Sequence, residues 1–242
     1  MCYTVKRLKR LEMKNALLAL NALSARAAQL PGEWPLALHM LEGHAPRFFA
    51  QAQLGPKLDA VLRQLQLRPL GLDASLTEPE AMARADARWL LRLRGRVVPP
   101  LDAACASECL QRVAREASSL HVWLLGALMG LELPYVSVGP VHDLYWQTHR
   151  VLLDTDYLAR PPSPKVQDAL DALEAALPQM WEWNGADLLG EALFCLQCGG
   201  RELETHVERF ATLQGEDGSF DNDAHATAVG LLVLAHHHEW TG

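Results

Sequence analysis

The segment 142–157, HDLYWQTHRVLLDTDY, carries several residues that could do chemistry at helical spacing. His142, His149 and Asp156 are spaced seven residues apart, and Tyr145 follows His142 by three. Each residue of an α-helix turns about 100°, so residues seven apart differ by only about 20° and share one face. Imidazole and carboxylate groups bind metal ions and, with phenols, transfer protons. The stripe therefore indicates a metal-binding or acid–base role.

A straight helix cannot present both His149 and Asp156 to one metal ion. The two residues are two turns apart, which is about 10.5 Å along the helix axis. One of them would ligate, and the other would orient a ligand or move a proton. We assign His149 to the metal, and we predict that Asp156, Tyr145 and His142 are the catalytic residues that handle protons.

The remaining metal ligands are expected from neighbouring helices. Glu191 lies in the run DLLGEALFCL, where an acid among leucines is unusual unless it is paired or ligating. His225 lies at the start of the last helical segment. His149, Glu191 and His225 would form a two-histidine, one-carboxylate set suited to Fe²⁺ or Zn²⁺. The structural alternative is that His142 and His149 are buried hydrogen-bonding residues and that Glu191 lies on a solvated face.

Other polar residues near this set have simpler interpretations. Asp187 precedes Glu191 by one helical turn on the same side, and either residue could point outward. Asp221 and Asp223 are interpreted as caps of the last helix. Four of the five cysteines fall in two pairs, which are interpreted as semi-buried thiols rather than a four-cysteine zinc site: Cys105 with Cys109, and Cys195 with Cys198. The histidine run 236–238 could bind metal adventitiously.

The elements that must position these residues are helices. Helical periodicity dominates the sequence, alternating strand patterns are scarce, and Pro and Gly pairs mark the breaks. Thr77 and Glu80 form a capping-box pattern at the start of one helix. The sequence therefore predicts an all-α fold of about ten helices joined by short loops. They are expected near 5–29, 34–53, 56–67, 77–95, 102–131, 140–158, 164–180, 185–198, 201–213 and 223–239.

We expect one helical domain over residues 1–242. The best boundary candidate is the connection 95–101, GRVVPPL, but its apolar residues make a poor flexible linker. It would separate an N-terminal helical layer, 1–98, from a C-terminal layer of α-hairpins, 99–242, packed on it. From residue 102 onward the helices come in pairs, as in stacked α-hairpins, without a clean fixed-period repeat.

Composition narrows the class of partner. A formal net charge of −7 argues against nucleic-acid binding. Five cysteines suggest reduced thiols in a cytoplasm. The N-terminal basic and apolar stretch is interpreted as an amphipathic helix rather than a signal peptide, and no apolar run approaches the roughly 20 residues of a membrane span. We therefore expect a cytoplasmic protein with a small-molecule or peptide substrate, and the oligomeric state stays open.

The stretches GADLLGEALFCLQCGG (185–200) and LQGEDGSFDNDAHATAVGLLVLA (213–235) resemble a repeat of the α/α-toroid proteins, which include terpenoid cyclases and protein prenyltransferase β-subunits. Gly218 would permit the tight turn of that repeat, and Phe220 would pack between neighbouring helices. In prenyltransferase β-subunits a histidine at the start of the equivalent helix binds zinc, and His225 is similar in position. The resemblance implies an α/α-toroid-like, incomplete barrel whose helix N-termini surround a cavity.

The sequence also departs from those families. The acidic Asp-x-Asp-Asp motif of class II terpene cyclases is approached only by Asp154-Thr155-Asp156-Tyr157, and there is no DDxxD motif. The zinc-ligand cysteine of the prenyltransferases has no clear counterpart. The chain is also short for a complete barrel of six hairpins.

Three functions follow as expectations. The first is a metal-dependent enzyme of specialised metabolism that acts on a small or peptide-borne substrate in an apolar helical-barrel cavity, with one Fe²⁺ or Zn²⁺ activating water or dioxygen. The second is a terpene-cyclase-like or prenyltransferase-like protein with Asp154 or Asp156 as the acid. The third is a non-catalytic helical binding or scaffold protein in which the stripe is structural.

Overall fold

A computed structural model describes residues 2–26 and 33–241, and the fold of these residues is all-α, as predicted. The described residues contain no β-strand. None of their helices combines the length and the apolar character needed to cross a bilayer. The helices, in chain order, are α1 (Cys2–Arg26), α2 (Glu33–His44), α3 (Pro46–Gln51), α4 (Gly55–Gln66), α5 (Glu78–Leu93), α6 (Ala103–Glu116), α7 (Ser119–Leu128), α8 (Pro140–Asp154), the 3₁₀ turn η2 (Pro164–Val166), α9 (Gln167–Trp183), α10 (Ala186–Cys198), α11 (Glu204–Ala211) and α12 (Ala224–Thr241).

Two segments predicted as single helices are each broken in two. The predicted helix 34–53 is interrupted where α2 ends at His44 and α3 begins at Pro46. Proline is favoured at the first position of a helix because the N–H it lacks has no partner there. The predicted helix 102–131 is interrupted before α7, where the side chain of Ser118 accepts a hydrogen bond from the His121 backbone N–H at 3.3 Å. Both breaks follow from local helix-start signals.

The chain divides into two compact units. The first comprises Met1–Gly55 and Gln147–Gly242, and the second comprises Pro56–Trp146. The connection 95–101 lies inside the second unit, so the layers considered at 1–98 and 99–242 do not coincide with these units. The interpretation of the whole chain as one domain stays a prediction, as does the toroid-like arrangement.

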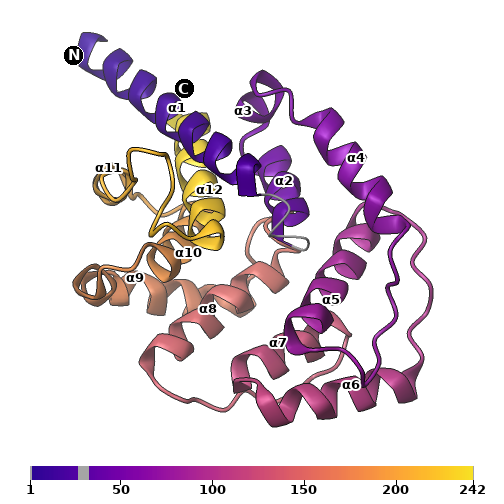
Figure 1. Cartoon of the computed structure of the whole chain (residues 1–242). Helices are drawn as coiled ribbons and strands as arrows, with labels where there is room; N and C mark the ends of the chain where they lie inside the picture. The colour runs from indigo at the N-terminus through magenta and orange to yellow at the C-terminus, as the bar shows by residue number, and fades with distance from the viewer. Residues whose placement is uncertain (1, 27–32, 242) are drawn as a thin grey trace. The chain divides into compact units, whose positions relative to one another are not determined.

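Helix α12 is the centre of the first unit. It packs against α1, α2, α3, α10 and α11, and α10 packs in turn against α9 (Figure 1). All residues of α12 from 226 to 237 are buried, and so are residues 188–196 of α10. A helix that is apolar on all sides is typical of the centre of a core. Polar groups on the facing turns of α10 and α12 are therefore held inside the unit.

Close helix approach depends on small residues at two places. A Cβ atom at Gly190 would lie 2.7 Å from Val229 Cγ1, so glycine lets α10 come close to α12. Gly218 has φ of +88° and lies against the backbone of Leu18, which only glycine tolerates well. Phe220 is fully buried, and its ring stacks on Phe210 with centroids 4.9 Å apart. The predicted roles of Gly218 and Phe220 are confirmed.

In the second unit, α5 packs against α6 and α7. The capping box predicted at Thr77 is confirmed, because Glu80 Oε2 accepts hydrogen bonds from the Thr77 backbone N–H at 2.8 Å and from its hydroxyl at 2.7 Å. The buried Arg88 donates to the carbonyl oxygens of Leu70 and Pro99 at 3.1 and 2.6 Å. Those bonds hold the loops on either side of α5 against it.

Candidate metal centre

Glu191 is a buried acid on the second turn of α10, with 6% of its surface exposed. Thr148 on α8 donates its hydroxyl proton to Glu191 Oε2 at 2.6 Å. His149 Nδ1 lies 3.9 Å from the same oxygen, and His225 Nε2 on α12 lies 3.2 Å from Glu191 Oε1. Two of the predicted ligands, His149 and His225, thus lie beside the third, Glu191, but His149 is not in the group of ligand atoms that lie within 4.8 Å of one another.

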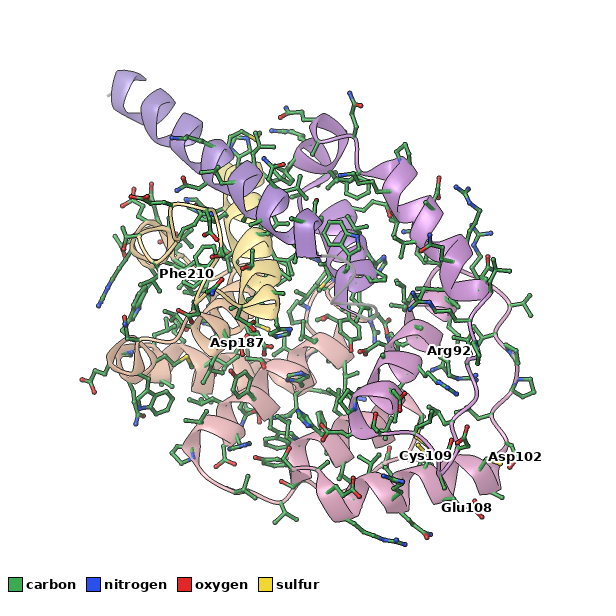
Figure 2. The ribbon with its side chains drawn as sticks, in the orientation of Figure 1. Arg92, Asp102, Glu108, Cys109, Asp187 and Phe210 are labelled. Carbon is green, nitrogen blue, oxygen red and sulfur yellow. The ribbon has the colours of Figure 1, made fainter. Side chains whose placement is uncertain are left out.

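Asp187 completes the cluster. It lies one turn before Glu191 on α10, where residues four apart share a face, and its Oδ1 lies 3.2 Å from His225 Nε2. One ligand atom from each of Asp187, Glu191 and His225 lies within 4.8 Å of the other two (Figure 2 labels Asp187). These residues form a set of two carboxylates and one histidine, and we refer to it as the acidic centre.

His149 acts on this centre through Thr148. Its Nδ1 lies 3.3 Å from Thr148 Oγ1. Because the one hydroxyl proton of Thr148 is used in the hydrogen bond to Glu191, the Thr148 oxygen can accept a hydrogen bond from the N–H of His149 Nδ1. The order of donors is therefore His149 to Thr148 to Glu191. This hydrogen-bond chain orients the carboxylate, and it connects the buried acid with an imidazole that can move a proton.

Two aspartates in the loop before α12 position the helices of the centre. Asp221 Oδ2 accepts a hydrogen bond from the backbone N–H of Ala186, the first residue of α10, at 2.6 Å. Asp223 Oδ1 accepts from the backbone N–H of Ala226 at 2.9 Å and caps α12. Of the two predicted caps of the last helix, Asp223 has that role, whereas Asp221 joins the loop to α10. The first turns of α10 and α12 are thereby held side by side.

Electrostatics keep the buried acid charged. Burial by itself would raise the pKa of Glu191, but the adjacent His149 and His225 and the hydrogen bond from Thr148 lower it below the usual value. The side chains of Asp187 and His225 are 35% and 40% exposed, whereas that of Glu191 is 7% exposed. The centre therefore combines a charged, buried carboxylate with two side chains that are partly open to solvent.

The distances in the acidic centre match those between ligands of a divalent ion. Metal bonds of about 2.0–2.2 Å to nitrogen and oxygen, at angles between about 90° and 110°, place the two ligand atoms about 2.8–3.6 Å apart. His225 Nε2 lies 3.2 Å from Asp187 Oδ1 and 3.2 Å from Glu191 Oε1. Nitrogen and oxygen donors of this kind suit Zn²⁺, Fe²⁺ and Mn²⁺.

The stripe of His142, His149 and Asp156 does not extend over one helix, and this corrects the sequence interpretation. Helix α8 ends at Asp154. Residues 156–158 have φ between +51° and +66°, and the Leu158 backbone N–H donates to Thr155 Oγ1 at 2.9 Å, which fixes this left-handed turn. Asp156 pairs with Arg160 at 3.0 Å outside the helix. His149 and Asp156 therefore do not share a helical face.

The other predicted catalytic residues lie elsewhere. His142 is exposed and Tyr145 is partly buried, and both belong to the second unit, at the N-terminal end of α8. Their catalytic roles stay predictions. Asp154, an acid in the cyclase alternative, accepts hydrogen bonds from the hydroxyl and the backbone N–H of Ser163 at 2.7 and 2.8 Å. Both of its oxygens thus hold the loop that follows α8.

Thr148 was not predicted from the sequence as a site residue, although a signal for it exists. Thr148 and Val151 are the buried residues of α8, and their spacing of three marks the inner face of that helix. A hydroxyl on an inner face requires a polar partner there. Glu191, the buried acid of α10, is that partner.

The sequence profile of the DUF6895 family, described as a domain of unknown function, matches residues 10–232. The chain therefore belongs to this family. The matched range includes every residue of the acidic centre. No curated protein and no solved structure matches the chain significantly.

Proposed function

We propose that this protein is a metal-dependent enzyme whose divalent ion, Zn²⁺ or Fe²⁺, is held by Asp187, Glu191 and His225. The observation that carries the proposal is the convergence of these three ligand atoms within 4.8 Å around a buried, charged carboxylate. The oxygen and nitrogen donors, their convergence and their partial access to solvent support a catalytic site, where the protein leaves a coordination position open.

A metal ion accounts for the cluster better than hydrogen bonds alone. His225 Nε2 carries at most one hydrogen, yet oxygens of Asp187 and Glu191 both lie 3.2 Å from it. Asp187 and Glu191 place two carboxylates next to His225, with His149 3.9 Å from Glu191, and burying charge that is not fully compensated costs several kcal/mol. A divalent cation would neutralise that charge and satisfy all three ligand atoms at once.

The chemistry would be activation of water or dioxygen, which a bound Zn²⁺ or Fe²⁺ supplies as a Lewis acid or redox centre. The protein's own groups have distinct tasks. Glu191 is fixed by the Thr148 hydroxyl, and His149 can deliver or accept a proton through that hydroxyl. The exposed side of Asp187 and His225 admits the substrate, for which we propose a small or peptide-borne molecule.

Zinc receives support from the position of His225. It is the second residue of α12, and it closely follows the Asp-Gly-Ser-Phe turn. That is the position in which the resemblance to prenyltransferase β-subunits implies a zinc-binding histidine. The proposal therefore includes an α/α-toroid-like arrangement of the helices.

The test is the metal content of tag-free protein purified without chelator, measured by plasma mass spectrometry. We expect the metal content of Glu191→Gln and His225→Gln to fall by about one ion per chain relative to the parent. Glu208→Gln makes the same chemical change at an exposed position and should retain the parent's content. The C-terminal histidine run should stay in place, because His236 and His237 are buried and their deletion would disturb the core.

A folded parent without stoichiometric metal would contradict the proposal. So would variants at Glu191 and His225 that keep their native circular dichroism and the parent's full metal content. Retention in both variants would assign any bound metal to other residues.

A further inference from the structure

A second group of potential metal ligands lies in the first unit, away from the acidic centre. His44 is the last residue of α2, Cys198 is the last residue of α10, and His236 lies on α12. One ligand atom from each lies within 4.8 Å of the other two. On α10, Cys198 is seven residues after Glu191, and on α12 His236 is eleven residues after His225. Those separations are about 10.5 and 16.5 Å along the helices, so the two groups are distinct.

Both imidazoles are oriented by backbone carbonyl groups. His44 Nε2 donates to the carbonyl of Leu158, and His236 Nδ1 donates to the carbonyl of His44 at 3.2 Å. A carbonyl oxygen only accepts, so Nε2 of His44 carries the proton and its Nδ1 carries a lone pair, whereas His236 has a second backbone hydrogen bond, with the carbonyl of Gln197. Metal-bound histidines commonly have this arrangement, in which the outer N–H is held by a carbonyl or a carboxylate.

The distance between the first two ligands fits a tetrahedral ion. His44 Nδ1 lies 3.5 Å from Cys198 Sγ. Zinc bonds of about 2.3 Å to sulfur and about 2.0–2.1 Å to nitrogen, at a tetrahedral angle, separate the two atoms by about 3.6 Å. The observed distance between His44 Nδ1 and Cys198 Sγ therefore matches the distance expected between two ligands of one zinc ion.

The protonation states agree with a metal site and disagree with a reactive cysteine. Burial lowers the pKa of His44, and it lowers the pKa of His236 to about 4, so both imidazoles are neutral as ligands must be. Burial raises the pKa of the Cys198 thiol, so this thiol stays protonated in the absence of a metal. A cysteine nucleophile needs a lowered pKa, whereas a bound zinc ion deprotonates its thiol ligand directly.

The cluster opens onto a cavity. All three residues line a space of 970 Å³, together with residues that include Gln197, Arg160 and Arg201. Small-molecule sites typically occupy about 300–1,000 Å³. A zinc ion with three protein ligands keeps its fourth position for water or substrate, and here that position can face the cavity.

We infer that His44, Cys198 and His236 form a second metal site, for Zn²⁺, at the wall of this cavity. The site is independent of the acidic centre, because it shares no ligand with that centre. Its thiolate ligand gives it a spectroscopic signature that a centre made of carboxylates and imidazole cannot produce. The sequence interpretation treated the histidine run 236–238 as an adventitious metal binder. One residue of that run, His236, is a ligand of the proposed site.

The test is cobalt substitution of the whole, metal-free chain. Saturating Co²⁺ should produce a near-ultraviolet charge-transfer band from thiolate to cobalt, and Cys198→Ser should abolish it. Cys195→Ser makes the same change one turn earlier on α10, where the thiol contacts the carbonyl of Thr148 instead, and should retain the band. Glu191→Gln should also retain it, which separates this site from the acidic centre.

Two results would overturn the second site. One is cobalt binding by the folded parent without a thiolate band, which indicates adventitious binding by histidines. The other is a band that persists in folded Cys198→Ser, which assigns the thiolate to another cysteine. Neither result bears on metal binding by Asp187, Glu191 and His225, so failure of one site can be told from failure of the other.

Discussion

His225 Nε2 lies 3.2 Å from Glu191 Oε1, and this contact joins the first turn of α12 to the second turn of α10. It connects the central helix of the first unit with the helix that carries the buried acid. Asp187, whose side chain is partly exposed, contacts the same nitrogen. His225 therefore lies between a buried carboxylate and one that solvent can reach. The response of the protein to metal, to acid and to substitution follows from this arrangement and from the packing that maintains it.

Zinc should stabilise the chain through Glu191 once Cys198→Ser has removed the thiol ligand of the second site. An ion that binds only the folded state stabilises it by about 2.7 kcal/mol at a free concentration 100 times Kd. We expect Zn²⁺ to raise the melting temperature of the Cys198→Ser chain by several degrees, as measured by differential scanning calorimetry. Adding Glu191→Gln to that chain should remove the rise, because the buried ligand is lost.

Glu208→Gln in the same Cys198→Ser background is the matched control for this shift. It makes the same chemical change at an exposed position and should keep the full rise. Equal shifts with and without Glu191→Gln would place the bound zinc elsewhere.

Acid should destabilise the metal-free parent partly through Glu191. Its pKa is lowered in the folded state, so the unfolded chain binds more protons at low pH. The stabilisation is present above the usual glutamate pKa of about 4.3 and is lost as the pH falls through the lower, folded value. Urea titrations in the presence of chelator, between about pH 3 and pH 7, measure the free energy of unfolding. This free energy should fall less on acidification for Glu191→Gln than for the parent. Identical losses would mean that folding does not lower the pKa of this carboxylate.

Thr148→Val should destabilise the protein by about 1–3 kcal/mol, because it keeps the side-chain shape and leaves the buried Glu191 carboxylate without its donor. Thr148→Ser retains the hydroxyl and should lose less. The measurement is the free energy of unfolding from denaturant titration. A valine variant as stable as the parent would show that the Thr148 hydroxyl does not support the acid.

Gly190→Ala should also be destabilising, by about 1–3 kcal/mol, although alanine is the better helix former. The added Cβ would lie 2.7 Å from Val229 Cγ1 and 3.1 Å from the Phe210 ring, so α10 and α12 would have to separate. Gly43→Ala is the matched control, since a Cβ there meets no atom within 4 Å, and it should be neutral or stabilising. If both substitutions stabilise the chain, close packing at Gly190 is not needed.

Local signals predicted the parts of the fold that local chemistry decides. The capping box at Thr77 and the turn at Gly218 follow from residues a few positions apart, and both are confirmed. The end of α8 does not follow from such signals. Its left-handed turn at 156–158 contains no glycine and depends on hydrogen bonds to Thr155 and on the burial of Tyr157 and Leu158. The helical pattern of the sequence therefore extends to residue 158, whereas α8 ends at Asp154.

The acidic centre was partly predictable for a related reason. Glu191 stands out because an acid in an apolar helix needs a partner, and His225 stands out at a helix start. The contributions of Thr148 and Asp187 depend on how α8 and α10 are rotated toward each other, which periodicity alone does not specify. His44 and Cys198 are 154 positions apart and share no motif, so only the packed unit brings them together.

The most direct test of the central claim is the anomalous scattering of zinc-loaded crystals, recorded on both sides of the zinc absorption edge. The account predicts a zinc peak about 2.0–2.2 Å from His225 Nε2 and from one oxygen each of Asp187 and Glu191. A well-ordered cluster without a peak, with the carboxylates and His225 joined only by hydrogen bonds, would contradict it.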